Sequence, residues 1–133
     1  MQLLVLGNNY PLDEIRNAKI ETPTNTNMYS YKDFVGDVQR CIGAKVDYIA
    51  GSITLSKTPT VSRYKNNRHA VVKPVQKYLY ALGYTEVGNA DGIAGVKFEQ
   101  AVNRYQREVL KYKKVDGEIT KGQKMWKSLL QLI

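Results

Sequence analysis

Residues 75–130 read VQKYLYALGYTEVGNADGIAGVKFEQAVNRYQREVLKYKKVDGEITKGQKMWKSLL, and this stretch decides the fold. Asp-Gly pairs at positions 91–92 and 116–117 divide it into three segments, the first of which extends back to residue 71. In each segment apolar residues recur at the i, i+3, i+4, i+7 spacing that collects side chains on one helix face. These positions are Val71, Val75, Tyr78, Leu79 and Leu82; Phe98, Ala101, Val102, Tyr105 and Val109; and Met125, Trp126, Leu129 and Leu130. Short amphipathic helices with short connections bury such faces in a small bundle, so the sequence predicts an all-α fold.

The connections between these segments carry turn and helix-end signals. Gly83 follows the first segment, where a left-handed helix C-terminus favours glycine. Asp91-Gly92 predicts a turn, and Gly95 stands where the next helix is expected to begin. Thr120 and Gln123 have the T-x-x-Q spacing of a capping box, which predicts the start of the third helix.

The order of these pieces resembles the peptidoglycan-binding domain family across roughly residues 70–132. Two departures are Phe98, where the family usually has threonine, and Tyr105, where it usually has phenylalanine. The resemblance implies a three-helix, non-catalytic module attached to cell-wall hydrolases of bacteria and phages. The residues that carry it are Val75-Gln76, Leu79, Leu82-Gly83-Tyr84, Asp91-Gly92-Ile93-Ala94-Gly95, Ala101-Val102, Tyr105-Gln106, Asp116-Gly117, Trp126 and Leu129.

A shorter copy of the same unit precedes the main one. Val38-Gln39 corresponds to Val75-Gln76, and residues 47–51 (DYIAG) correspond to residues 91–95 (DGIAG). Tyr48 replaces the turn glycine, which predicts that this turn does not need a positive φ unless its backbone is strained. Pro59 is expected to cut a short second helix off. The first helix of this copy is predicted from the apolar face of Phe34, Val35, Val38, Cys41 and Ile42, with Ser30 and Asp33 as its cap.

The sequence therefore predicts a leader or linker at 1–28, a degenerate repeat at 29–68 and a full repeat at 69–133. The two repeats are expected to pack as one body, because neither alone buries much surface. Residues 45–62 and 66–84 also resemble the C-terminal wall-binding region of N-acetylmuramoyl-L-alanine amidases from clostridia-like bacteria and their phages. That resemblance implies the binding half of an endolysin or autolysin amidase.

The composition of the chain limits the classes of partner that it can bind. The chain has 133 residues and a net charge of +8, from 20 Lys and Arg against 12 Asp and Glu. This charge favours anionic partners such as phosphate- and carboxylate-rich wall polymers, although a mixed, soluble surface is the simpler interpretation. No apolar run is long enough to span a membrane. The apolar start, residues 1–6, lacks the basic flank of a secretory signal, so we expect synthesis in the cytoplasm and action at the cell wall after lysis or export.

Catalytic candidates are few. One histidine, His69, and one cysteine, Cys41, cannot form the usual zinc sites, so neither a metal nor another cofactor is predicted. A Cys41–His69 dyad is the remaining covalent option, but Cys41 falls on an apolar helix face, where a buried thiol is the simpler interpretation. The carboxylates available for acid–base chemistry lie mostly in repeated turns: Asp47, Asp91, Asp116 and Glu99. We predict a binding module with no catalytic residue.

A wall-binding groove needs hydrogen-bond donors, a cation and an aromatic face. The candidates gather around the second turn and the helices beside it: Gln76, Tyr84, Asp91, Gly92, Ile93, Gly95, Arg104, Tyr105 and Trp126. Tyr84 is the strongest candidate for an exposed aromatic because it follows a helix-ending glycine. Tyr105 and Trp126 also fit the core, Asp91 fits a turn, and Gln76 fits a loop cap.

Two functions of other classes stay open at this point. A basic helical domain can bind nucleic acid, although carboxylates in the Asp-Gly turns would face the phosphates. An oligomerisation module is the other alternative, with a homodimer interface formed by Tyr78, Tyr80, Tyr112 and Leu132.

Overall fold

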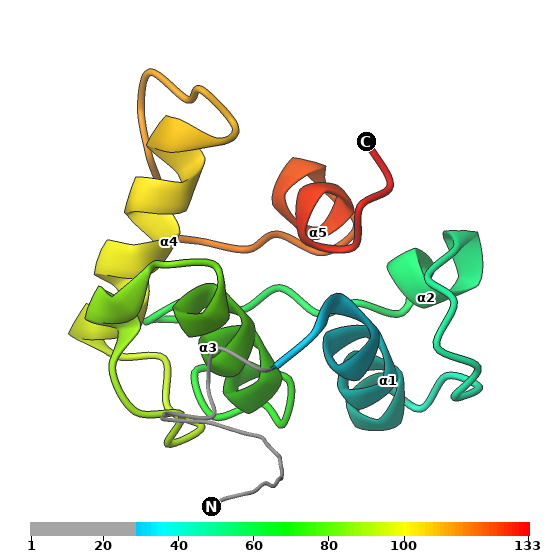
Figure 1. The fold of residues 1–133 in the computed structure, drawn as a ribbon. Helices are drawn as coiled ribbons and strands as arrows, with labels where there is room; N and C mark the ends of the chain where they lie inside the picture. Colours follow the sequence, from blue (N-terminus) through cyan, green and yellow to red (C-terminus); the bar gives the residue numbers. More distant parts are fainter. Residues whose placement is uncertain (1–28) are drawn as a thin grey trace, which may run out of the picture.

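The computed structural model describes residues 29–133, so the predicted leader at 1–28 lies outside the described residues. Within this range the chain is helical, as predicted. Its elements are α1 (Tyr31–Ile42), α2 (Ser52–Ser56), α3 (Val72–Ala81), the 3-10 helix η2 (Thr85–Val87), α4 (Val96–Glu108) and α5 (Lys124–Leu129). α1 and α3 lie side by side, with α4 beyond α3 and α2 beyond α1 (Figure 1). None of the described helices is long and apolar enough to cross a membrane.

Most helix ends follow the local signals in the sequence. The Ser30–Asp33 capping box of α1 is confirmed, with Ser30 Oγ accepting from the Asp33 N–H at 3.0 Å. Gly83 has φ 103° just after α3, and Gly95 is the N-cap of α4. The 3-10 helix η2 packs between α3 and α4. These ends set the lengths of the connections that carry the turns.

The predicted capping box of α5 is wrong. The helix begins at Lys124 with Gln123 as its N-cap, and no side chain caps it. Thr120 instead donates its hydroxyl to Glu118 (2.8 Å). The physical reason lies upstream, because Ile119 forms an antiparallel bridge with Val61, and Gly122 takes a φ of 64°. Residues 119–122 are thus extended or turned, so the helix starts later.

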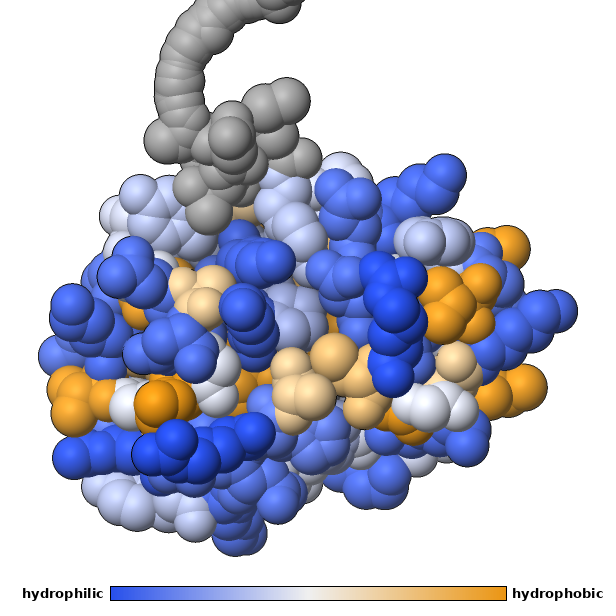
Figure 2. Space-filling view, turned by 90° about the horizontal axis from the view of Figure 1, so that it is seen from below, coloured by the Kyte–Doolittle hydropathy of each residue, from blue (hydrophilic) through white to orange (hydrophobic). Residues whose placement is uncertain are grey.

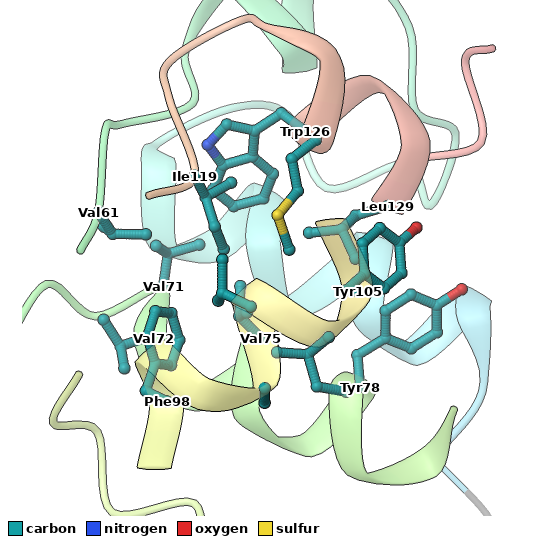
Figure 3. Close-up of a cluster of buried hydrophobic side chains, with 14 of the residues drawn as sticks. Val61, Val71, Val72, Val75, Tyr78, Phe98, Tyr105, Ile119, Trp126 and Leu129 are labelled. Atoms are coloured by element: carbon teal, nitrogen blue, oxygen red, sulfur yellow. The ribbon is translucent and has the colours of Figure 1, made fainter. Parts of the chain in front are cut away.

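One hydrophobic core joins the helical regions of residues 29–133. Figure 3 shows the part of this core to which α3, α4 and α5 contribute. Phe34 of α1 stacks on Tyr78 of α3 with ring centroids 4.2 Å apart. Val61, from the segment after α2, is fully buried in the same cluster. The segments on both sides of residue 68 therefore share a core, which agrees with the expectation that they pack together.

Tyr48 adopts the strained alternative of its prediction. It has a φ of 61°, so the turn does adopt the left-handed conformation, in which a bulky residue is strained. Its ring lies over Gly36 of α1, where a Cβ atom would come within 2.2 Å of the Tyr48 Cε1. Arg40 also donates to the Tyr48 hydroxyl (3.4 Å). Packing on a helical glycine accompanies the strained backbone and holds the ring in place.

This packing predicts a coupling between positions 36 and 48. Gly36→Ala should destabilise the natural protein by about 1 kcal/mol, because the new methyl displaces the ring. In a Tyr48→Gly background the same change should stabilise by about 0.5–1 kcal/mol, through alanine's higher helix propensity. Urea unfolding of the four proteins measures the coupling. An equal effect of Gly36→Ala in both backgrounds would show that the ring does not occupy this place.

Candidate functional site

A buried glutamine holds the turn between η2 and α4. Gln76 of α3, only 2% exposed, donates from Nε2 to Asp91 Oδ1 (3.0 Å) and to the Ile93 carbonyl (3.1 Å). Its Oε1 accepts the Gly92 N–H at 2.9 Å. Asp91 Oδ1 also accepts the Ile93 N–H at 2.9 Å. We call this arrangement of a helix glutamine and a turn aspartate a Gln–Asp clamp.

The same clamp occurs at two other turns. In each, the glutamine is 1% exposed, donates to the aspartate and to the carbonyl two residues beyond it, and accepts a turn N–H. Gln39 of α1 holds Asp47 (2.9 Å), and Gln106 of α4 holds Asp116 (2.8 Å). The residue after each aspartate has a positive φ: 61° at Tyr48, 80° at Gly92 and 65° at Gly117. The three turns thus share one geometry.

Hydrogen bonds in two of the clamps favour the charged form of the turn aspartate. The hydrogen bond from Gln76, together with the Ile93 N–H, holds the pKa of Asp91 below its usual value. At Asp47 the Ile49 N–H contributes most and Gln39 next, and they lower the pKa of that carboxyl too. Both carboxylates are therefore anionic at neutral pH.

Beside the Asp91 clamp lies an open hollow of about 240 Å³, which we call the Asp91 hollow. Phe98 and Val87 give it a buried apolar floor, and Ile93 and Val96 are exposed apolar residues on its lining. Its remaining lining residues are Gln76, Asn89, Asp91, Gly95 and Lys97. An anion, Asp91, and a cation, Lys97, thus line the same small space.

Five of the nine predicted site residues meet at this hollow or its turn: Gln76, Asp91, Gly92, Ile93 and Gly95. The lining residues that the sequence did not predict are Val87, Asn89, Val96, Lys97 and Phe98. A signal for Val96 and Lys97 was present, since they form the first turn of α4 directly after Gly95. Asn89 carried no such signal, because its position depends on the path of the loop after η2.

The other four predicted residues lie elsewhere. The prediction of an exposed Tyr84 is wrong: it is 8% exposed, packs on Tyr105, and is covered by the Arg104 guanidinium 4.4 Å from its ring centroid. Arg104 donates to the Gly83 carbonyl (2.9 Å) and to Glu86 (3.0 Å). Trp126 is fully buried. Apolar burial and the cation–π contact keep these aromatic faces from serving as a platform.

Three residues predicted as catalytic or dimer candidates have structural roles. His69 Nδ1 accepts the Val71 N–H (3.0 Å) at the start of α3. Burial raises the pKa of the Cys41 thiol, which disfavours the reactive thiolate. Tyr78, proposed for a dimer interface, is 5% exposed and stacked on Phe34. In residues 29–133 no group of three or more His, Cys, Asp or Glu side chains is arranged to hold a metal ion.

Comparison with known families gives one match in this region. Residues 68–123 match the family model described as "Putative peptidoglycan binding domain". No curated protein and no solved structure matches the chain. The matched residues run from the turn before α3 through the Asp116 clamp, and so include the whole Asp91 hollow. Domains of this family are non-catalytic modules that bind peptidoglycan at the cell wall. Residues 68–123 of this chain are therefore similar to the peptidoglycan-binding domain family.

Proposed function

We propose that the chain binds peptidoglycan through the Asp91 hollow and recognises the peptide stems of the polymer. The observation that carries this proposal is that Asp91 and Lys97 line one hollow with an apolar floor. Wall peptides are short and rich in alanine methyl groups, and they carry carboxylates and, before cross-linking, an amino group. Lys97 suits a carboxylate, Asp91 an ammonium group, and Phe98 with Ile93 a methyl group.

The burial of the aromatic candidates favours the peptide over the glycan. Sugar rings commonly lie against exposed aromatic faces, but Tyr84, Tyr105 and Trp126 are at most 8% exposed. The Asp91 hollow is small, which suits a peptide end rather than a disaccharide. The polar and charged lining then supplies the specificity.

Net charge adds a second, weaker attraction. A charge of +8 draws the chain toward an anionic wall, and this attraction fades as salt rises. Binding within the hollow should fade less, because partly enclosed charges are screened less. Salt dependence therefore separates the two components.

We further propose that the chain anchors a wall hydrolase of the endolysin or autolysin amidase type to its substrate. The support is the resemblance of residues 45–62 and 66–84 to the binding regions of such amidases, together with the non-catalytic nature of the matched family. In this role the chain supplies affinity, and its partner domain supplies the bond-breaking groups.

A charge reversal in the hollow tests the proposed site. Lys97→Glu should weaken binding to wall sacculi stripped of teichoic acid by about tenfold or more, because it removes the cation and adds repulsion to the peptide carboxylate. Lys114→Glu is the matched control, since it changes the net charge equally at an exposed position that does not line the hollow. Binding isotherms with both variants at the same salt give the comparison. Equal weakening by both variants would assign the effect to net charge and contradict the proposed site.

A further inference from the structure

A second hollow lies beside the Asp47 clamp, on the far side of α1 from the Asp91 hollow. Its volume is about 310 Å³, and we call it the Asp47 hollow. Ile49 and Ile53 line it and are 71% and 69% exposed, although both are large apolar residues. Lys45 supplies a cation and Asp47 an anion. Neither the family match, which begins at residue 68, nor the proposed site includes this hollow.

The two hollows correspond position by position. Each is lined by the clamped aspartate, the isoleucine two residues later, the glycine that caps the next helix, and the three residues that follow it. The pairs are Asp47 with Asp91, Ile49 with Ile93, Gly51 with Gly95, Ser52 with Val96, Ile53 with Lys97, and Thr54 with Phe98. Ile53 stands where the Asp91 hollow has Lys97. In the Asp47 hollow the cation is instead Lys45, which precedes the turn. Each hollow thus has an aspartate, an isoleucine, a glycine and a lysine on its lining, although the residues at the start of the following helix differ in kind.

The backbone N–H three residues after each clamped aspartate indicates what such a turn can bind. At the second turn the Ala94 N–H donates to the Asn67 carbonyl (2.7 Å). At the third turn, Ile119 and Val61 exchange both backbone hydrogen bonds (2.9 and 3.0 Å). Ala50 is the equivalent residue at the first turn, and no hydrogen bond within residues 29–133 reaches its N–H. The first turn therefore offers a backbone donor that its two counterparts use to bind a backbone carbonyl of another segment.

We propose that the Asp47 hollow is a second peptide-binding subsite, which takes an extended wall peptide with its carboxylate at Lys45 and its methyl groups on Ile49 and Ile53. The Ala50 N–H of the same turn, between the lining residues Ile49 and Gly51, is a further donor available to that peptide. This proposal rests on the proposed function, because it assigns the same ligand class to the second hollow. Residues 29–68 then act as a degenerate repeat that has kept its binding turn.

The placement of the two hollows suits a polymer. The loops before α2 and before α4 lie on opposite sides of the α1–α3 pair (Figure 1). Figure 2 shows an interrupted band of apolar side chains that crosses one face of the molecule between hydrophilic ones. The Phe34–Tyr78 stack joins α1 and α3 in one core, so the two hollows keep a fixed separation. Two weak subsites held apart in this way gain avidity on a wall that presents many stems.

NMR spectroscopy of the ¹⁵N-labelled full chain, titrated with a soluble stem tetrapeptide, tests the second subsite. We expect two groups of amide signals to shift, one from residues 45–54 and one from residues 89–98. Lys45→Glu should abolish the first group of shifts and leave the second, and Lys97→Glu should do the reverse. Lys114→Glu serves as the control for net charge and should leave both groups unchanged.

The outcomes separate the two proposals. On stripped sacculi, Lys45→Glu should also weaken binding by about tenfold through lost avidity. Shifts confined to residues 89–98 would overturn the second subsite while the proposed function stands. Shifts in neither group would overturn both. Because Lys45 is exposed and makes no ion pair within residues 29–133, the Lys45→Glu protein should keep its thermal stability.

Discussion

Trp126→Ala is expected to lower the free energy of unfolding by about 4 kcal/mol, near the top of the range for a buried aromatic residue. The side chain is fully buried, and its Nε1 donates to the Pro59 carbonyl at 2.7 Å. The substitution would leave a large cavity and an unpaired carbonyl. It would also separate α5 from residues 58–62, which pair with the third turn through Thr60 and Val61.

Thermal unfolding followed by circular dichroism measures this effect, and a loss of about 15 °C in Tm is expected. Trp126→Phe is the matched control. It keeps most of the apolar volume but loses the hydrogen-bond donor, so it should cost only about 1–2 kcal/mol. A loss below about 1 kcal/mol for Trp126→Ala would contradict the packing of α5 on the core.

Gln76→Glu is expected to lower the free energy of unfolding by about 3 kcal/mol at neutral pH, although it barely changes the side-chain volume. The amide donates to both Asp91 and the Ile93 carbonyl. A carboxylate in its place loses both donors and faces the Asp91 carboxylate, to which the Ile93 N–H still donates.

The loss should shrink as the pH falls, and the sign follows from the two pKa shifts. Burial and the neighbouring carboxylate raise the pKa of the introduced carboxyl, so its cost is present above that pKa and disappears as it gains a proton. In the natural protein the pKa of Asp91 is lowered. The stability that this carboxylate contributes is therefore complete above its unfolded pKa, about 3.9, and is lost only as pH falls through the lower folded value.

Urea unfolding of the Gln76→Glu protein between pH 7 and pH 5 measures this dependence. Gln100→Glu makes the same chemical change at an exposed position of α4 and should stay within about 0.5 kcal/mol of the natural protein at every pH. An effect of Gln76→Glu as small as that of the control would show that the clamp does not hold the second turn.

Local signals predicted the features that depend on few residues. The α1 capping box and the glycine N-cap of α4 each involve neighbours in sequence, and both are confirmed. The start of α5 was predicted wrongly because the Val61–Ile119 bridge joins residues far apart in the chain. The exposure of Tyr84 was predicted wrongly for a similar reason. The Arg104 side chain that covers its ring comes from another helix.

The Gln–Asp clamps also depend on contacts between residues that are distant in the sequence. The repeated Val-Gln and Asp-x-Ile motifs are present in the sequence, which also predicts that Gln76 fits a loop cap. The pairing of each glutamine with the following aspartate depends on how the helices cross, so it appeared only in the structure. The positive φ of Tyr48 likewise follows from its clamp, which imposes one turn geometry whether or not glycine is present.

The most direct measurement is retention of the purified chain on Gram-positive sacculi, before and after removal of teichoic acid, across a salt series. If the chain binds peptidoglycan, it should stay bound to stripped sacculi at moderate salt, where attraction by net charge alone is screened. Retention that disappears on stripping, or that falls to zero with salt on both materials, would contradict peptidoglycan binding and leave only attraction to anionic secondary polymers.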